Sequence, residues 1–421
     1  MWNTALLWLA CGTLPSWDAP LAREPVWLRA AQGRVELLTT ADARTAQWAL
    51  AELEALRGAV AQTAPWLAAA SAPLRIVAFS SEEEYSHYRI NPHSPGYFAG
   101  GSEWSVIVLA RLDPGSAASL RHEYIHYLLR SSGRKLPLWL EEGLADALSP
   151  LPRREADRRV RLLRSGPLMN WGELFAAKPA AALYQDWQQA RLFYAQSWLL
   201  TEALIYSAEG RLDPERLDEW AAMGPSEEQA AQALIRRFLK RPRPVGRNWK
   251  LAPGNLSYEV APAPAGLVWT VLGRVSMQLG RLDAAEEHLR KAGLVAPESF
   301  SLLGDLEYRR GRLEEARRAW RMAMARDAAD VRTLLRLAVL EQDLPGGEMT
   351  PVLEKILAMD PTQEEARLAL ASQYIRRGRW LDARQRLNEV RSAPPRWANF
   401  YQQALALVHT RTGGADLLGT N

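Results

Sequence analysis

Residues 121–146 read RHEYIHYLLRSSGRKLPLWLEEGLAD and contain the most specific pattern in the chain. The stretch begins with H-E-x-x-H, in which His122 and His126 are four residues apart. Residues at that spacing share one face of a helix, so both imidazoles can bind the same ion. Tetrahedral Zn²⁺ accepts such a pair as two of its ligands. Glu123, directly after the first histidine, can act as general base toward a metal-activated water.

The surrounding sequence favours a helix for this pattern. Asp113 can cap its start, Pro114 suits its first turn, and Gly133 suits the position beyond its end. The alternative is a chance match on an ordinary surface helix. Random placement of 6 His and 48 acidic residues in 421 positions gives about 0.01 such matches. The pattern therefore indicates a metal site.

A catalytic zinc site needs a third protein ligand and keeps its fourth position open. Residues 137–146 predict a second helix that begins at Pro137 and folds back on the first. Glu142 and Asp146 share one face of that helix, whereas Glu141 points about 100° away. We therefore predict that Glu142 binds the metal and that Glu141 is exposed to solvent. Asp146 either accepts a hydrogen bond from a ligand histidine or is a surface charge.

The H-E-x-x-H pattern followed by W-L-x-E-G-L-A resembles the gluzincin metallopeptidases, the relatives of thermolysin and aminopeptidase N. It is most similar to the bacterial peptidase-MA-like family. The resemblance implies zinc bound by His122, His126 and Glu142, with Glu123 as catalytic base. It also implies an α+β, zincin-like domain with a small mixed sheet and a helical zinc-site region. A broader likeness spans residues 27–210, but no G-A-M-E-N-like segment is present, so aminopeptidase specificity is not implied.

Residues 192–200 (LFYAQSWLL) are similar to a helix that follows the metal site in peptidase-MA-like proteins. Tyr194 in this stretch is a candidate hydrogen-bond donor to the oxyanion that forms during peptide hydrolysis, or it only packs. The Arg-rich stretch 153–164 predicts a solvated helix face rather than a binding patch. His87 and His93 lack ligand spacing and are expected at the surface.

The region before the motif predicts strands alternating with helices. Strands are expected at residues 35–40, 74–79 and 104–110, with an Ala-rich helix at 41–62 and a short acidic helix from Glu82. In gluzincins the strand before the zinc helix borders the cleft and can pair with an extended peptide, so residues 104–110 are the candidate. The alternative is that this segment is an inner strand.

The carboxyl-terminal part changes to a helical repeat. The pattern GRLDAA at Gly280 recurs as GRLEEA at Gly311 and as GRWLDA at Gly378. These separations are close to one and two periods of the 34-residue tetratricopeptide repeat, whose stacked helix pairs offer a concave surface to a protein or peptide. We therefore expect a signal-like apolar segment (1–20), a zincin-like peptidase domain (27–247), a linker (248–264) and all-α tetratricopeptide-like repeats (265–410).

Composition restricts the partners and the location. The net charge of +4 is small and both signs are interleaved, which gives no case for nucleic acid. The single cysteine, Cys11, excludes an intramolecular disulfide. It lies in an apolar stretch, residues 1–12, that is too short to span a membrane but resembles a secretory signal and a lipoprotein cleavage site. We expect export to the periplasm or cell envelope, with membrane attachment only through a lipidated Cys11. The alternatives are an apolar cytoplasmic terminus, or a natural chain that starts upstream of Met1.

Together these features predict a zinc peptidase with a repeat region that binds a protein partner or substrate. Zn²⁺ would polarise the peptide carbonyl, while Glu123 would take a proton from water and pass it to the leaving amine. Two alternatives stay open. One is a scaffold protein whose zincin domain is catalytically idle, and the other is a zinc hydrolase of a non-peptide bond. H-E-x-x-H sites can also accept other divalent ions.

Overall fold

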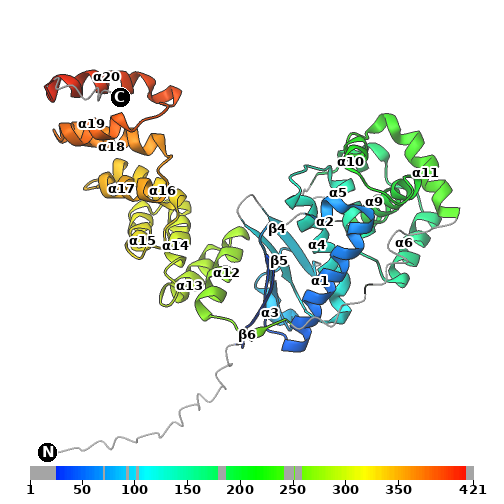
Figure 1. The fold of residues 1–421 in the computed structure, drawn as a ribbon. Helices are drawn as coiled ribbons and strands as arrows, with labels where there is room; N and C mark the ends of the chain where they lie inside the picture. Colours follow the sequence, from blue (N-terminus) through cyan, green and yellow to red (C-terminus); the bar gives the residue numbers. More distant parts are fainter. Residues whose placement is uncertain are drawn as a thin grey trace, which may run out of the picture.

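The computed structural model describes residues 25–69, 72–91, 94–100, 104–178, 186–240, 251 and 258–413. Cys11 and His93 lie outside these residues, so the expectations for the leader and for His93 stay predictions. The described chain forms a mixed α+β region with a six-stranded sheet, followed by a row of helical hairpins (Figure 1). No helix among the described residues is long and apolar enough to cross a membrane.

The sheet is mixed, and its strand order is β4-β5-β3-β2-β1-β6. Strands β2, β3 and β5 run parallel at its centre, whereas β1, β4 and β6 pair antiparallel with their neighbours. In chain order the strands are β1 (Leu28–Gln32), β2 (Val35–Thr39), β3 (Leu74–Ala78), β4 (Gly96–Gly100), β5 (Ser105–Leu109) and β6 (Val260–Pro262). The three strands expected from the sequence are the three parallel ones, which are buried on both faces and therefore read as apolar runs.

One face of the sheet is covered by two helices, one of which carries both histidines of the candidate site. Leu37, Ile76 and Ile107 lie side by side in register on β2, β3 and β5, and they are part of the main core. Helices α1 and α4 pack on this face. The helices of this region are α1 (Ala43–Thr63), α2 (Pro65–Ala68), α3 (Glu82–Ser86), α4 (Ala117–Ser131), α5 (Leu138–Ala147), α6 (Arg153–Ser165), α7 (Trp171–Ala176), α9 (Trp187–Ser207), α10 (Pro214–Ala221) and α11 (Glu228–Lys240).

The opposite face of the sheet is covered by α12 (Ala265–Gln278), the first helix of the region expected to hold the repeats. Leu38, Val77 and Val108 from the sheet form one buried cluster with Val271 and other side chains of α12. Strand β6, which lies within the segment expected as a linker, pairs with β1 at the edge of the sheet. The sheet region and the first repeat helix therefore share a hydrophobic core.

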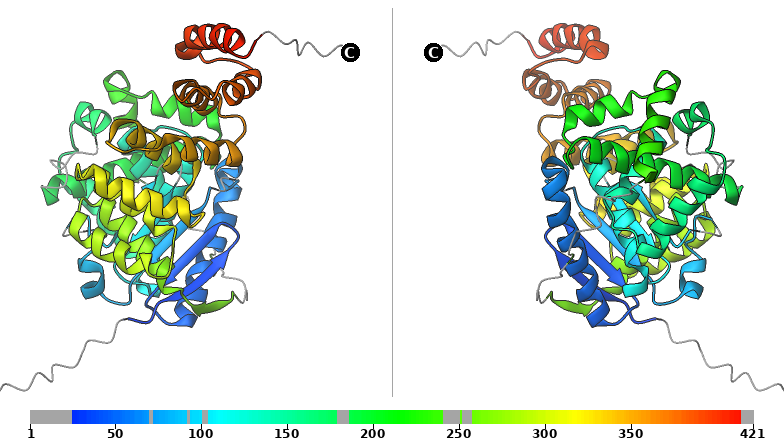
Figure 2. Two further views of the ribbon diagram at one scale, coloured as in Figure 1. Left: turned by 90° about the vertical axis from the view of Figure 1, so that its left-hand side faces the viewer. Right: turned by 90° about the vertical axis from the view of Figure 1, so that its right-hand side faces the viewer.

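The remaining hairpins extend in a row away from the sheet, with α20 at the far end (Figure 1, Figure 2). Gly280, Gly311 and Gly378 of the recurring pattern have φ of 71°, 74° and 70°, and Gly346 takes the same turn with φ 66° in the divergent third hairpin. Glycine adopts this left-handed conformation without a steric penalty, which explains the recurrence. These helices are α13 (Leu282–Gly293), α14 (Ser299–Arg309), α15 (Leu313–Ala325), α16 (Val331–Asp343), α17 (Met349–Met359), α18 (Glu364–Arg376), α19 (Trp380–Asn388) and α20 (Ala398–Arg411).

Candidate metal centre

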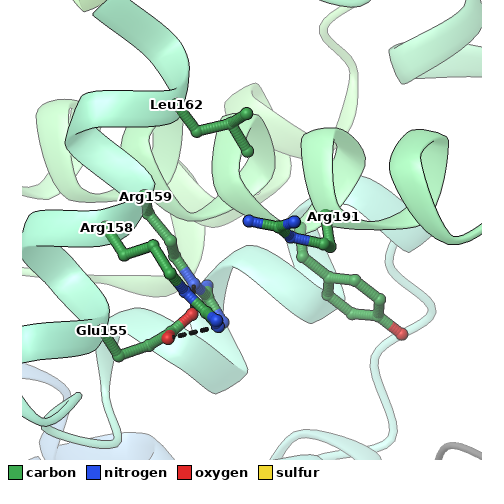
Figure 3. Close-up of a pocket in the computed structure, with 6 residues that line it drawn as sticks. Glu155, Arg158, Arg159, Leu162 and Arg191 are labelled. Carbon is green, nitrogen blue, oxygen red and sulfur yellow. Dashed lines mark hydrogen bonds and ion pairs between the residues drawn. The ribbon is translucent and has the colours of Figure 1, made fainter.

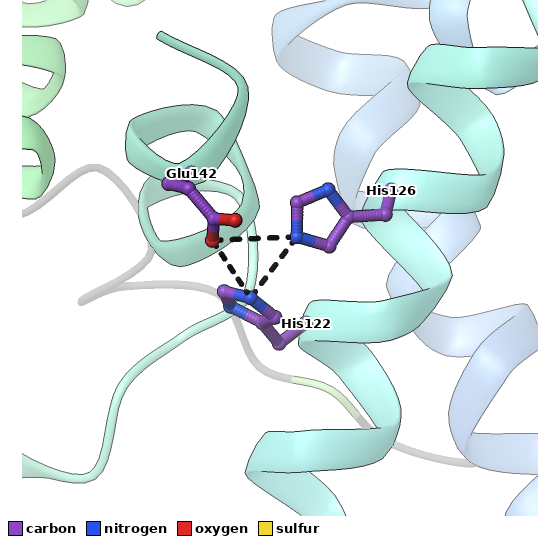
Figure 4. Close-up of side chains that lie close together, drawn as sticks. All are labelled: His122, His126 and Glu142. Carbon is purple, nitrogen blue, oxygen red and sulfur yellow. Dashed lines mark hydrogen bonds and ion pairs between the residues drawn. The ribbon is translucent and has the colours of Figure 1, made fainter. Parts of the chain in front are cut away.

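Three side chains from two neighbouring helices converge on one point (Figure 4). His122 and His126 project from α4, and Glu142 projects from α5. The Nε2 atoms of the two histidines are 3.1 Å apart, and they lie 3.4 and 3.5 Å from Glu142 Oε2. Ligands about 2.0–2.1 Å from a tetrahedral ion are separated by about 3.3 Å, so these three atoms have the spacing of a metal-binding group.

The local sequence explains how α4 and α5 come to face each other. Asp113 caps a short 3₁₀ turn, Pro114–Ser116, through its own side chain and that of Ser116, and this turn leads directly into α4. Gly133 follows α4 with φ 77°, a conformation that reverses the chain and suits glycine. Pro137 then precedes the first residue of α5. The expected helical hairpin is therefore present.

Gly143, next to Glu142, sets the depth at which α5 packs on α9. A Cβ atom at this position would lie 2.1 Å from Thr201 Oγ1 and 2.6 Å from the carbonyl oxygen of Ser197. No side chain fits there, so the backbone of α5 rests directly against that of α9. This contact explains in physical terms why glycine follows the glutamate in the motif.

The charges of the group fit a divalent cation. Glu142 Oε2 is buried and has no hydrogen-bond partner among the described residues. Burial alone would raise the pKa of Glu142, but the charge of His126 and contacts with both histidines outweigh it and hold that pKa far below its usual range. Burial would lower the pKa of His126, yet the carboxylates of Glu142 and Glu141 raise it to about 9. In the metal-free protein, protons on the histidines thus balance the carboxylate, and a cation can take their place.

Asp146 lies on the far side of His122 from the convergence point. Its Oδ1 is 3.0 Å from His122 Nδ1, and its Oδ2 forms an ion pair with Arg159 of α6. Burial would raise the pKa of Asp146, but the charges of Arg159 and His122 lower it, so the carboxylate stays ionised. An ionised Asp146 can fix the tautomer of His122 that leaves Nε2 free for a metal.

Arg159 corrects the prediction that the 153–164 stretch is a solvated helix face. Its side chain is only 16% exposed, whereas that of Arg153 is 87% exposed. The sequence did carry a signal, because Arg159 is three residues after Ala156 and four before the buried Leu163, on the apolar side of α6. A charge on the apolar side of a helix needs a buried partner, and here that partner is Asp146.

Glu141 corrects a second prediction, because it is not free in solvent. Its side chain is 17% exposed, its Oε1 is 3.1 Å from Arg130 Nη2, and the same oxygen is 3.6 Å from His126 Nδ1. The helix-face argument treated α5 as isolated. In the folded chain α4 lies against α5, so a side chain about 100° from Glu142 still meets α4. Both histidines therefore have a carboxylate on the side away from the convergence point.

Glu123 lies between the histidines and the edge of the sheet. Burial raises its pKa, partly offset by the charges of His122 and His126 and by a hydrogen bond from the backbone of Phe98. Phe98 belongs to β4, which is the edge strand, while the segment expected to border the cleft, residues 104–110, forms the inner strand β5. Two of the five residues in β4 are glycine, a residue that is uncommon in strands, so the sequence pattern did not predict this strand.

Tyr194 lies on α9, where it is half-buried and lines a cavity with the arginines of α6. Its ring packs edge-on against Phe193 at 5.6 Å between centroids. This position is on the Arg159 side of the candidate site, and the expected role toward an oxyanion stays a prediction. His87 is exposed at the end of α3, as expected.

Comparison with known proteins identifies the carboxyl-terminal region. The tetratricopeptide repeat family matches residues 350–407, which correspond to α17–α20. No curated protein matches the chain. The chain thus combines an α+β region, whose histidine and glutamate group fits a zincin-type motif, with tetratricopeptide hairpins. Such repeats indicate interaction with another protein.

Proposed function

We propose that the protein is a zinc-dependent peptidase of the zincin type. The observation that carries this proposal is the convergence of His122 Nε2, His126 Nε2 and the buried, unpartnered Glu142 Oε2, with Glu123 one residue from the first histidine. Three protein ligands with an open fourth position are the arrangement of catalytic rather than structural zinc. When bound, the metal would supply Lewis-acid polarisation of the peptide carbonyl and of water.

Glu123 would carry the proton in this reaction. Its half-buried carboxylate has a raised pKa, which brings that pKa closer to neutral pH and makes Glu123 a better proton acceptor than an exposed glutamate. It would take a proton from the attacking water and deliver it to the leaving amine. The Phe98 amide holds this carboxylate at the edge of the sheet.

The edge strand β4 supports a peptide as the substrate. Its inner side pairs with β5 from Gly96 to Gly100, and it is the terminal strand of the sheet among the described residues. The outer edge of such a strand presents backbone groups that can pair with an extended peptide. Because Phe98 of this strand hydrogen-bonds Glu123, a peptide bound along β4 would pass beside the proposed base.

The repeats would bind a protein, either as a partner or as a substrate. This part of the proposal rests on the tetratricopeptide match at residues 350–407 and on the hairpins that continue it toward the sheet. Stacked helix pairs of this kind create an extended surface rather than an enclosed pocket, which suits a polypeptide ligand.

The proposal is tested by metal analysis and peptide cleavage on the full chain. Wild type should purify with about one zinc per chain or take it up on addition, and it should cleave an unbiased mixture of peptides. Glu123→Gln should keep the zinc and lose cleavage, whereas Glu142→Ala and His126→Ala should lose both. Wild type that binds no zinc would refute the metal site. Zinc-loaded wild type that cleaves nothing would refute the peptidase and favour the scaffold alternative.

A further inference from the structure

A cavity of about 210 Å³ opens between α6 and α9, and three arginines line it. Figure 3 shows the guanidinium groups of Arg158 and Arg159 of α6 side by side next to Glu155, with Arg191 of α9 extending toward α6 from across the cavity. Leu162 and Tyr194 form the less polar part of the wall. A water molecule occupies about 30 Å³, so this cavity has room for about seven. That volume suits one amino-acid side chain and is far too small for a folded partner.

The carboxylates around this cavity compensate only part of its positive charge. Glu155 forms ion pairs with Arg158 and with Arg159. The buried Asp146 also pairs with Arg159. Arg191 forms no ion pair within the described chain. An uncompensated guanidinium facing two others favours a bound anion, and a planar carboxylate matches the guanidinium fork.

The cavity is adjacent to the candidate metal centre. Arg159 lines it and pairs with Asp146, and Asp146 Oδ1 is 3.0 Å from His122 Nδ1. One ion pair and one hydrogen bond therefore separate the cavity from the ring of a proposed metal ligand. The path from His122 Nε2 through Asp146 to the Arg159 guanidinium is about 10 Å long, which is the span of about three extended residues of a bound substrate.

We propose that this cavity is a specificity subsite that receives a carboxylate of the substrate, bound by Arg191 together with Arg158. Arg159 already has two carboxylate partners and acts here as part of the wall. The inference rests on the proposed peptidase function and assigns it a substrate class: peptides with an acidic group at one fixed position near the scissile bond. An Asp or Glu side chain and a free carboxyl terminus both offer this chemistry.

The test compares three zinc-loaded full-length proteins on one peptide mixture, produced by digesting a whole proteome. They are wild type, Arg191→Gln, and Arg153→Gln as a matched control on α6, where the side chain is 87% exposed and its nearest carboxylate is 3.9 Å away. New peptide ends are mapped by mass spectrometry. A parallel mixture of peptides with amidated carboxyl termini separates the two sources. The side-chain carboxylates of Asp and Glu are protected during the amidation and deprotected afterwards, so only the terminal carboxylates are removed.

Wild type should cleave preferentially where one fixed position holds Asp or Glu, or at a fixed distance from a free carboxyl terminus. Arg191→Gln should lower kcat/KM for those peptides by about tenfold or more, the usual effect of losing a charge-assisted hydrogen bond, and leave other cleavages unchanged. Arg153→Gln should match wild type. Binding gives an independent measurement: in the Glu123→Gln background, calorimetry should show an acidic peptide binding about tenfold tighter than its Gln or amide counterpart, and Arg191→Gln should abolish that difference.

The outcomes separate this inference from the function on which it rests. Cleavage without any fixed acidic preference, or with a preference that Arg191→Gln leaves intact, overturns the subsite and keeps the peptidase. The absence of cleavage by zinc-loaded wild type overturns both. A preference lost equally in the Arg153→Gln control assigns the effect to general surface charge and also overturns the subsite.

Discussion

Replacing Gly143 with alanine should destabilise the protein, although alanine is the better helix former. The helix-propensity gain is about 1 kcal/mol. Against it stands a new Cβ atom 2.1 Å from Thr201 Oγ1 and 2.6 Å from the carbonyl oxygen of Ser197. The second contact is with backbone, so no change of rotamer can relieve it. Overpacking of this kind costs about 1–3 kcal/mol. Because the backbone carbonyl of Ser197 cannot move aside easily, we expect a cost near the upper end of that range at Gly143. The net loss in the free energy of unfolding should be about 2 kcal/mol.

Gly58→Ala is the matched control, because Gly58 is also in a helix, α1, and a Cβ atom there would meet nothing within 4 Å. This variant should gain about 1 kcal/mol from propensity alone. Urea-induced unfolding followed by circular dichroism measures both on the same scale. If Gly143→Ala is as stable as Gly58→Ala, the close approach of α5 to α9 is wrong.

The same substitution should weaken metal binding, because α5 carries Glu142. A shift of α5 away from α9 moves the carboxylate relative to the two histidines on α4, and ligand sets tolerate errors of only about 0.2 Å. Adding Thr201→Ala should restore part of the lost stability, since it removes the nearer contact but leaves the Ser197 carbonyl in place. Thr201 Oγ1 is buried without a hydrogen-bond partner, so its removal alone leaves no other group unsatisfied. Complete rescue would mean that the backbone contact contributes nothing.

Four further results are expected. Asp146→Ala should lower zinc affinity by about 10–100-fold, measured by competition with a chelator, and unchanged affinity would remove its role in orienting a ligand. Glu141→Ala should lower it less, because its oxygen is 3.6 Å from His126 Nδ1. The pKa of His126 in the metal-free protein is raised to about 9. The proton on His126 therefore stabilises the metal-free folded protein fully below pH 6.5, and this stabilisation is lost as the pH rises through 9. Zinc competes with the same proton, so apparent zinc affinity should rise from pH 6.5 to 9, and a plateau above pH 7.5 would contradict the shift. Deleting residues 265–421 should give an insoluble product, whereas deleting 298–421 should leave a soluble chain that binds zinc, as assayed by sedimentation and metal content.

The candidate metal group could be predicted from the sequence because its geometry is mostly local. The i,i+4 spacing of the histidines and the periodicity of the second helix specify which side chains share a face before any tertiary contact is known. The features that were missed depend on neighbours distant in sequence. Glu141 is half-buried because α4 lies beside it, and β4 is a strand because β5 offers it a partner. Arg159 could be predicted only in part. The periodicity of its own helix places it on the buried side, but nothing in the sequence identifies Asp146 as its partner.

The structure at the boundary between the expected linker and the expected repeats also depends on tertiary contacts that the sequence does not reveal. Residues 260–262 contain two apolar residues and a proline, which is too little for a strand by composition, yet their pairing with β1 makes them one. Helix α12 carries apolar residues that a tetratricopeptide hairpin would bury against the next unit. In this chain Val268, Val271, Leu272 and Val275 face the sheet instead. A sequence pattern reports that a face is apolar and does not report what covers it.

This shared core has a consequence for how the repeats could serve the candidate site. The hairpin α12/α13 is held by more than apolar contact, because His288 Nε2 is 3.0 Å from Tyr88 Oη and Arg281 donates a hydrogen bond of 2.8 Å to the carbonyl of Arg89. The sheet therefore has α4, which carries both histidines of the candidate metal centre, on one face, and α12, where the row of hairpins begins, on the other. A flexible tether would raise the local concentration of a bound protein without orienting it. A row of hairpins that starts in the core of the sheet region instead gives its ligand a fixed direction relative to β4 and Glu123. We therefore expect the repeats to position a substrate and not merely to capture it.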